Sequence, residues 1–422
     1  MVGGGVVGLC LAEALERRGA KAVVFEAGRC GGAASAGNAG WISPGVSNPL
    51  PAPGVVSQAI RWMLDPSSPL LIHPVLRPSF ARFLFDFWRS TRPARYGAGM
   101  AALVAATRRA VADFDSLAER CRFEMHHEGM LFVARGSRAL EGEQRVLRQH
   151  QELGYDGEVR PMGRDEVLGE EPGLSDAIIG GLFASAECHV RPETVTEGVA
   201  ARLREVGVEI HENTPVQGLA RSNGVWSVAT ADGGAQADRV VIAGGVASAD
   251  LLAPLGVRLP LLGAKGYSLT LEQPPIRLKR PIYLIEDKVG VSPYNGAVRL
   301  AGTLELGSTP GQINSRRVAG IREAGARALR DWSPDLDWKA WTGERPLLPD
   351  GLPAIGPVPG NAGLFAATGH AMLGVTLAPT TAELLAPVVL EGRPSLELAP
   401  FSLARFDVRG VSPTQEKSEC GD

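Results

Sequence analysis

The chain has 422 residues, of which 45% are hydrophobic, and it contains 52 glycines, 31 prolines and a formal net charge of −3. This length predicts two or three domain-sized units with a large core, and the composition is typical of a loop-rich soluble α/β enzyme. The small net charge gives no reason to expect nucleic acid as a partner, and no apolar run reaches the ~18 residues that predict a membrane-spanning helix.

A glycine-rich stretch near the N-terminus predicts a nucleotide-binding site. A G-x-G-x-x-G motif over residues 3–8 leads into an amphipathic helix over 9–19, and a buried strand over 22–26 then ends in Glu26. In such a βαβ unit the glycines let the backbone approach a pyrophosphate, the helix N-terminus attracts its charge, and the acid binds the ribose hydroxyls. The acid also argues against a 2′-phosphate and therefore against NADP. The predicted cofactor-binding residues of the motif are Gly3, Gly5, Val6, Val7 and Gly8.

Only Met1 and Val2 precede these glycines, whereas the first strand of such a unit needs about five residues. We therefore expect a start codon assigned too late or a trimmed N-terminus. Because the missing strand would lie in the middle of the sheet, we expect this form to be less stable and to hold its cofactor less firmly.

After the first βαβ unit, we expect a loop whose small residues let the backbone lie close to a flat ligand. The chain is then expected to enter a second domain. Residues 28–40 are mostly glycine, alanine and serine, and an unstructured loop of this length is uncommon in a compact domain unless it is functional. Residues 46–78 alternate proline with apolar positions and predict irregular structure. An aromatic helix over 80–88, followed by three arginines, is interpreted as packed within the domain, with contact to a membrane surface as the alternative.

The remaining elements predict a nucleotide domain that a substrate domain interrupts twice. Further helices are expected over 96–121, 137–153, 192–205, 316–330 and 376–390, and a hairpin over 123–135. A buried run that ends at Ala243 and Gly244 is expected to rejoin the nucleotide sheet. Strands between 257 and 304 predict a mixed or antiparallel sheet as the floor of the substrate domain. We place the nucleotide domain at 1–45, 175–255 and 340–410, the substrate domain at 46–174 and 256–339, and a disordered tail at 411–422.

Five segments in sequence order carry a more specific resemblance than the glycine motif alone. They are the N-terminal motif with Glu26, residues 38–45 (Asn-Ala-Gly-Trp-Ile-Ser-Pro-Gly), residues 265–270 (Lys-Gly-Tyr-Ser-Leu-Thr), residues 343–346 (Gly-Glu-Arg-Pro) with Pro349-Asp350-Gly351, and residues 368–376 (Thr-Gly-His-Ala-Met-Leu-Gly-Val-Thr). Together they resemble the D-amino-acid oxidase superfamily of FAD enzymes, and most closely the bacterial D-amino-acid dehydrogenases. The resemblance runs nearly end to end. It implies an α/β fold with a discontinuous, Rossmann-like FAD-binding domain and an α+β substrate domain with a mixed or antiparallel sheet.

The resemblance implies FAD as the cofactor. A single nucleotide fingerprint agrees with FAD rather than NAD, and the chain has no cysteine between Cys188 and Cys420, so the cysteine linkage of some sarcosine oxidases is not expected and FAD should be noncovalent. The five cysteines lack C-x-x-C and zinc spacing, which predicts reduced thiols, no metal site and a cytoplasmic protein. By resemblance, the turn over 369–376 points a helix N-terminus at the flavin, where the reduced ring carries negative charge. The other residues expected to bind the cofactor are Glu26, Gly31, Gly32, Ser35, Asn38, Ala39, Gly40, Val216 (adenine end), Ala243, Gly244, Gly369, His370, Leu373, Gly374 and Thr376.

The resemblance also assigns the substrate site. The arginine of a G-x-R-P motif grips the substrate carboxylate in D-amino-acid oxidases, and Arg345 matches it; the alternative is a surface arginine in an ion pair. A tyrosine hydroxyl, from Tyr294 or Tyr267, and a backbone carbonyl at Met372 would complete the pocket. Because the oxidases have glycine where this chain has Met372, the pocket is expected to differ in shape. His370 is either catalytic or a packed histidine at a strand end.

The expected reaction is oxidation of the Cα–N bond of a D-amino acid by hydride transfer to flavin N5, which gives an imino acid that water hydrolyses to a 2-oxo acid and ammonia. The electrons are expected to pass to a quinone or a carrier protein. One alternative is a secondary amine such as D-proline, hydroxy-D-proline, glycine or sarcosine. Another is the flavin subunit of a hetero-oligomeric complex. A peripheral contact with the inner face of the cell membrane, through the helix over 80–88, is a further expectation.

Overall fold

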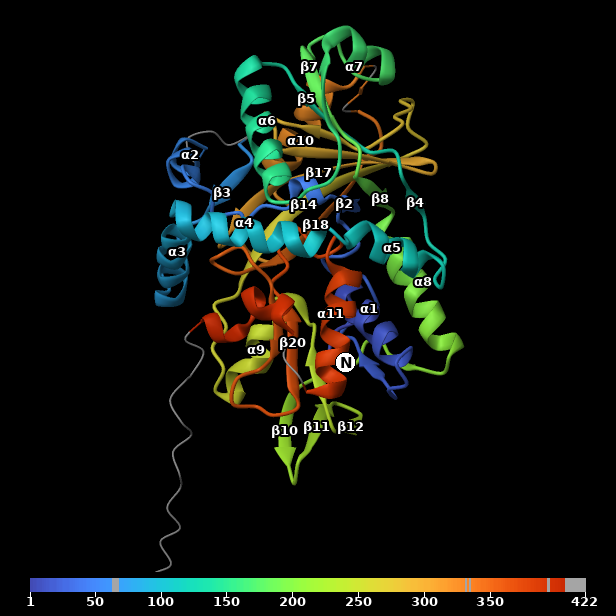
Figure 1. Cartoon of the computed structure of the whole chain (residues 1–422), viewed down its shortest axis with the longest axis vertical. Coiled ribbons are helices and arrows are strands. Elements are labelled where there is room, and N and C mark those ends of the chain that lie inside the picture. Colours follow the sequence, from blue (N-terminus) through green and yellow to red (C-terminus); the bar gives the residue numbers. More distant parts are fainter. Residues whose placement is uncertain (63–67, 331, 334, 393–394, 407–422) are drawn as a thin grey trace, which may run out of the picture.

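The computed structural model describes residues 1–62, 68–330, 332–333, 335–392 and 395–406. Figure 1 shows two bodies, one built around the N-terminal βαβ unit and the other around a large sheet, with helices α4 (Pro93–Thr107) and α5 (Ala110–Ala118) running across the boundary between them. The expected tail at 411–422 and part of the expected irregular stretch at 46–78 lie outside the described residues.

The first body, which we call the nucleotide body, has a sheet assembled from distant parts of the chain. Its strands are β1 (Val23–Phe25), β9 (Glu209–His211), β13 (Val240–Ile242), β19 (Ala354–Pro357) and β20 (Leu364–Thr368). Strand β1 pairs in parallel with β9, while β20 pairs in parallel with β13 and antiparallel with β19. Val2 forms parallel bridges to both Phe25 and Ile242, so the residue before the glycine motif joins the two halves of this sheet.

Helices cover this sheet and bury their apolar faces against it. They are α1 (Val6–Glu16), α8 (Pro192–Glu205), α9 (Ser248–Leu252) and α11 (Ala378–Glu391). Helix α1 packs against α8 and α11, and Leu9 and Leu11 of α1 are fully buried in the shared core. Gly19 ends α1 in the left-handed conformation (φ 85°), and the Ala20 N–H donates to the Leu15 carbonyl at 3.0 Å. Such a glycine satisfies the last carbonyls of the helix and turns the chain towards β1.

The second body is built on a nine-stranded mixed sheet in the described chain, ordered β18-β14-β17-β16-β15-β5-β7-β6 with β3 beside β17. The bounds are β3 (Leu70–Ile72), β5 (Met130–Ala134), β6 (Val159–Gly163), β7 (Gly180–Ala184), β14 (Leu262–Glu272), β15 (Ile282–Leu284), β16 (Val289–Tyr294), β17 (Ala297–Leu306) and β18 (Lys339–Leu347). Helix α10 (Ser315–Ala328) packs on β14 and β17 and covers one face of the sheet. The opposite face contacts the nucleotide body, and the candidate site lies there.

Smaller elements complete the fold. The short sheet β2 (Trp41–Ile42), β8 (Cys188–Val190) and β4 (Met125–His126) is antiparallel, as is the sheet β10 (Gly218–Ser222), β11 (Val225–Thr230) and β12 (Gly233–Ala237) at the lower end of Figure 1. The other helices are α2 (Val55–Trp62), α3 (Pro78–Ser90), α6 (Ser137–Glu152) and α7 (Arg164–Glu170). In the residues that the structure describes, no helix is long and apolar enough to cross a membrane.

Two expected elements were wrong. The single helix over 96–121 is divided at Arg108 and Arg109 into α4 and α5, which lets Asp113 of α5 accept a hydrogen bond from Thr380 of α11 at 2.7 Å. The expected hairpin over 123–135 does not form, because β4 pairs with β8 whereas β5 lies between β7 and β15 in the large sheet. In both cases contacts between distant segments decided the structure.

The expected domain limits at 175 and 340 stay predictions, but they divide the large sheet. Strand β7 lies on the nucleotide side of the first limit and pairs with β5 and β6, while β18 lies almost wholly beyond the second limit and pairs with β14. Both strands belong to the sheet that carries the candidate substrate site.

Candidate active site

The glycine motif folds into a turn that has no room for side chains. Gly3 has a φ of 109°, and a Cβ there would lie 2.4 Å from the carbonyl oxygen of Ala243. A Cβ on Gly8 would lie 2.1 Å from the Gly3 carbonyl oxygen, and Gly5 is the N-cap of α1. Only glycine fits the first and last positions of the motif, and the backbone at the N-terminus of α1 is therefore held close to the end of β13.

Glu26 and Ser35 bind the backbone of the same turn. The Glu26 carboxylate accepts hydrogen bonds from the N–H groups of Gly4 at 2.6 Å and Gly28 at 2.9 Å. The Ser35 hydroxyl accepts one from the Val6 N–H at 3.1 Å. Ser35 Oγ thus already accepts a hydrogen bond from one N–H group at the N-terminus of α1, a position that favours an anion. The acid and the hydroxyl predicted from the sequence lie together with the glycine motif, as a nucleotide site requires.

The glycine-rich loop over 28–40 packs tightly against α8 and β8. Gly31 has a φ of 72°, and a Cβ there would lie 2.2 Å from Thr196 Oγ1. Gly40 has a φ of 73°, and a Cβ would meet the Val190 carbonyl oxygen at 1.9 Å. A Cβ on Gly32 would approach the Arg29 carbonyl oxygen to 3.1 Å. The loop is therefore an ordered part of the site.

Arg299 of β17 fastens the loop to the large sheet. Its guanidinium donates from Nη1 to the carbonyls of Ala36 at 2.8 Å and Asn38 at 2.9 Å, and from Nε to Thr270 Oγ1 at 2.9 Å. Its other terminal nitrogen pairs with Glu193 of α8. One buried side chain thus links the substrate sheet, the loop and a helix of the nucleotide body.

Two residues of β16 hold the next loop carbonyl. The hydroxyls of Ser292 and Tyr294 donate to the Ala39 carbonyl at 2.7 Å and 2.8 Å. The Trp41 indole nitrogen donates to Ser292 Oγ at 2.8 Å, and burial raises the pKa of Tyr294 to about 12. Tyr294 therefore lies at the junction of the loop and the sheet, where its hydroxyl contacts the loop backbone.

The turn before α11 contacts the chain directly after the glycine-rich loop. Gly369 has a φ of 77°, and the Thr376 hydroxyl donates to the Trp41 carbonyl at 2.7 Å. His370 Nε2 lies 3.0 Å from Thr381 Oγ1 of α11, and burial lowers the pKa of this histidine to about 4. The neutral ring thus contacts α11, and whether His370 also has a catalytic role stays a prediction.

The other sequence-predicted residues lie around these elements. Ala243 donates its N–H to the Val2 carbonyl at 2.7 Å, with Gly244 directly after it, and Leu373 and Gly374 follow His370 in the turn. Val216 is half-buried in the core beside β10. The Met372 side chain is exposed. Their cofactor and substrate roles stay predictions.

Arg345 lies on the sheet face that contacts the nucleotide body. Its guanidinium passes over Gly266 of β14, where an added Cβ would lie 2.4 Å from Cζ. Nη1 donates to the Thr303 carbonyl at 3.2 Å, and within the described residues no carboxylate pairs with this side chain. Burial lowers the pKa of Arg345 to about 10, so it is still cationic at neutral pH. A cation without a counter-ion at this position can bind an anionic group of a ligand.

Tyr267, the other tyrosine predicted for the substrate site, points to the opposite face of the sheet. Its side chain packs in the core under α10, and its hydroxyl donates to Glu305 at 2.5 Å. Lys265 Nζ lies 3.1 Å from the same carboxylate. Because successive side chains of a strand alternate between faces, Tyr267 and the guanidinium over Gly266 are on different sides of β14. Tyr267 and Tyr294 thus lie on opposite faces of the sheet, with Tyr294 on the inner face where its hydroxyl donates to the Ala39 carbonyl, and the substrate role of either tyrosine stays a prediction.

Sequence reasoning missed Arg299 and Ser292. One signal was available for Arg299, since it is one of only two charged residues, with Glu305, in the otherwise mostly apolar strand Ala297–Leu306. A buried strand does not tolerate an arginine unless its donors are satisfied. Its loop partners lie more than 250 residues away, with a separation of 263 for Ala36 and 261 for Asn38, so the sequence could not identify them.

The site combines a glycine-lined βαβ turn and its acid with a mixed sheet whose Arg345 has no carboxylate partner among the described residues. This arrangement is typical of a dinucleotide-dependent oxidoreductase of two bodies. The chain belongs to the family of FAD dependent oxidoreductases (DAO), whose sequence profile matches residues 1–387. FAD is its cofactor. The residues present fit this cofactor, because Gly3 and Gly8 leave no Cβ between the motif and β13, and Glu26 and the α1 N-terminus supply the acid and the amide groups.

Relatives of nearly the same length agree with this assignment. A D-amino acid dehydrogenase of Cereibacter sphaeroides is 33% identical over 96% of this chain and 94% of the relative, and one of Vibrio vulnificus is 31% identical over 96% and 99%. Among solved structures, glycine oxidase from Geobacillus kaustophilus matches with a TM-score of 0.74 and 23% identity over 96% of this chain and 97% of the other. L-proline dehydrogenase from P. horikoshii matches with 0.73 and 18% over 96% of each chain. The structural matches show the shared fold.

Proposed function

We propose that this protein oxidises the Cα–N bond of D-amino acids to 2-oxo acids and ammonia. The observation that carries the proposal is Arg345, a guanidinium on the inner sheet face without a carboxylate partner among the described residues. The names of the relatives support the D-amino acid substrate class. When bound, FAD supplies the acceptor for the hydride that leaves Cα.

The residues of the chain act by positioning the substrate. The planar fork of Arg345 can bind the substrate carboxylate through two parallel charge-assisted hydrogen bonds. Arg299, Ser292 and Tyr294 keep the loop over 36–39 at a fixed position relative to the sheet. Because carboxylate and loop positions are then both fixed, Cα is held in one orientation, which lowers the barrier without a strong base. The carbonyl of Met372, in the turn after His370, is the proposed acceptor for the substrate amine.

We also propose a peripheral membrane contact through helix α3, with a membrane quinone as electron acceptor. Phe85 and Trp88 of α3 are 54% and 49% exposed, and Arg89 and Arg92 lie over their rings at 5.8 Å and 5.9 Å. Exposed aromatic rings flanked by arginines fit the interface of an anionic bilayer. A cavity of ≈ 490 Å³ adjoins the helix, partly lined by Phe80, Phe83 and Glu344, and its volume suits a small molecule.

The decisive experiment is an anaerobic visible spectrum of the FAD-loaded protein with D-amino acids, their L-enantiomers and cyclic imino acids. We expect D-amino acids to bleach the flavin band near ~450 nm, and their L-enantiomers to leave it unchanged. If only a secondary amine bleaches the flavin band, the substrate class is secondary amines and not primary D-amino acids. A flavoprotein that no compound bleaches would contradict the proposal and favour a missing partner subunit.

A further inference from the structure

Three polar groups of β14, β17 and β18 lack, among the described residues, the partners that their chemistry requires. The hydroxyls of Ser268 and Thr303 have no hydrogen-bond partner there, and both side chains are more than nine-tenths buried, at 0% and 7% exposure. The third group is the half-buried Arg345 guanidinium, which has one carbonyl acceptor and no carboxylate partner within the described chain. Buried hydroxyls are almost always paired, so such a cluster indicates a polar ligand that completes it.

The backbone at Thr303 has an unusual conformation. Lys265 pairs with Glu305 and Tyr267 pairs with Gly302, so two residues of β17, Thr303 and Leu304, lie opposite the single Gly266 of β14. This arrangement is a β-bulge. Thr303 has a φ of 58°, the left-handed conformation that glycine normally adopts at this bulge position. For a β-branched residue this φ is a strained outlier.

The strain has a local consequence. The bulge turns the Thr303 carbonyl towards Arg345 Nη1 at 3.2 Å, beside the guanidinium that lies over Gly266. Glycine would give the same backbone without the strain, so the backbone alone does not account for threonine. What threonine adds here is a hydroxyl, and that hydroxyl is buried without a hydrogen-bond partner in the part of the chain that the structure describes.

Ser268 lies on the same face of the sheet. It is two residues from Gly266 in β14 and therefore on the face where the guanidinium lies. It pairs with Ala301 of β17 and with Trp341 of β18. The indole of Trp341 lies over Gly343, where an added Cβ would be 2.3 Å from the ring, and it also packs on Gly37 of the loop. The hydroxyl is thus enclosed between the sheet and the nucleotide body.

We propose that the hydroxyls of Thr303 and Ser268 donate hydrogen bonds to the substrate carboxylate that Arg345 binds. This inference rests on the proposed function and extends it. A carboxylate has about four lone-pair sites, and the arginine fork satisfies two of them. The hydroxyls of Thr303 and Ser268 satisfy the remaining ones. The pocket so formed is selective for a carboxylate over an amide, whose NH₂ group would face these donors.

The test is the dissociation constant of pyruvate, a 2-oxo acid with the expected carboxylate, measured from the flavin spectrum of the FAD-loaded protein. We expect Thr303→Ala and Ser268→Ala each to weaken binding by roughly 10-fold or more, because each removes a hydrogen bond to a charged group. Thr303→Ser keeps the hydroxyl and should restore most of the affinity. Combined with Arg345→Lys, either alanine variant should cost less than the sum of the single effects.

A purely structural role of Thr303 would lower the Tm of Thr303→Ala together with its affinity for pyruvate. The proposed role predicts weaker pyruvate binding without any fall in Tm, because alanine strains the left-handed conformation less than threonine does. Asn223→Ala is the matched control, because Asn223 also has a positive φ (50°) but lies in the turn between β10 and β11; it should keep the wild-type affinity. The inference would be overturned if Thr303→Ala bound pyruvate as tightly as the wild type, or if Thr303→Ser weakened pyruvate binding as much as Thr303→Ala does. It would also be overturned if the wild type did not bind pyruvate. A wild type that binds pyruvate but is bleached by no D-amino acid would refute the proposed function alone.

Discussion

Arg345 and Arg299 illustrate how the same residue type takes different roles on one sheet face. Arg299 is paired with Glu193 and bonded to two loop carbonyls, so its charge and most of its donors are satisfied within the protein. Arg345 has one carbonyl acceptor, and its pKa is lowered by burial to about 10. A buried cation without a counter-ion costs stability, and a ligand carboxylate would offset that cost. Arg299 is therefore suited to connect the sheet with the loop and α8, whereas Arg345 is suited to bind a ligand.

We expect Arg345→Lys to raise the KM for D-amino acids by roughly 10- to 100-fold, because lysine keeps the charge but cannot form two parallel hydrogen bonds. Steady-state kinetics measure the effect, and the visible spectrum shows that FAD is still bound. Arg316→Lys on the exposed side of α10 is the control and should keep the wild-type KM. An unchanged KM in Arg345→Lys would remove Arg345 from the carboxylate role.

The pH dependence of product binding gives a second check on Arg345. A guanidinium is charged below its pKa, so affinity for a 2-oxo acid should be constant near neutral pH and should fall as the pH rises through about 10. The 2-oxo acid carries no amine, and its own charge does not change in this range. Titration of the flavin spectrum between pH 7 and 11 measures the effect, and a dissociation constant that does not rise over this range would contradict it.

At the scale of elements, the loop over 28–40 depends on the large sheet for its shape. Carbonyls of Ala36, Asn38 and Ala39 all accept hydrogen bonds from side chains of β16 and β17. The loop is otherwise rich in glycine and alanine and has few side-chain contacts of its own. We therefore expect flavin binding by this loop to be coupled to the substrate sheet.

Arg299→Lys should loosen the loop. Lysine can keep the ion pair with Glu193 but cannot reach both loop carbonyls with one nitrogen, and loss of one or two charged hydrogen bonds costs about 2 kcal/mol. We expect weaker FAD binding by roughly 10-fold and a lower Tm, measured by dilution-induced flavin release and by thermal unfolding. Arg191→Lys is a matched control, since Arg191 lies over the same Tyr294 ring at 5.9 Å but pairs with the exposed Glu272. Equal FAD affinity of the two variants would contradict the role of Arg299.

The elements also show which parts of the fold could be predicted from the sequence. Helix α8 begins at Pro192 and ends at Glu205 as expected, because proline at the first turn and an amphipathic pattern are local signals. No local signal marks the division between α4 and α5, where neither glycine nor proline occurs. The expected sheet was confirmed as mixed, but the pairing of β5 with β15 joins residues about 150 positions apart, and propensity does not identify such partners.

The candidate site was predictable only where a short motif specifies its own geometry. Gly3, Gly8 and Glu26 lie within one βαβ unit, and they came together as expected. Whether Tyr267 or Tyr294 lies on the inner face depends on the register among β14, β16 and β17, which no short motif in the sequence specifies. The bulge at Thr303 depends on the same register. Long-range pairing, rather than composition, therefore decides which side chains surround Arg345.

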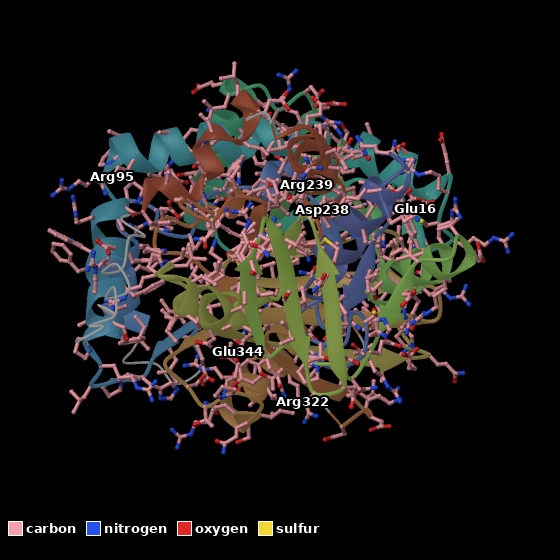
Figure 2. The ribbon with its side chains drawn as sticks, turned by 90° about the horizontal axis from the view of Figure 1, so that it is seen from below. Glu16, Arg95, Asp238, Arg239, Arg322 and Glu344 are labelled. Atoms are coloured by element: carbon pink, nitrogen blue, oxygen red, sulfur yellow. The ribbon has the colours of Figure 1, made fainter. Side chains whose placement is uncertain are left out.

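At the scale of the whole molecule, α3 exposes part of its apolar surface in the described structure. One face of this helix packs through Phe80 and Phe83 on the large sheet, while Phe85 and Trp88 point outward. Figure 2 shows Arg95, at the start of the next helix, at the outer edge of the molecule beside α3. The arginines near these rings give this edge a positive charge that suits an anionic lipid surface.

We expect the protein to bind vesicles that contain anionic lipid and to release them as the salt concentration rises, because electrostatic attraction is screened. The double variant Phe85→Ser with Trp88→Ser should lower the partition coefficient by roughly 10-fold or more, since it removes apolar area that would enter the interface. Co-sedimentation measures this effect. Ile179→Ser is the matched control, because Ile179 is 43% exposed and directly precedes β7, which lies away from α3 in Figure 1; it should bind like the wild type. If the double variant binds as well as this control, α3 is not the docking element, and a carrier protein becomes the better candidate for the electron acceptor.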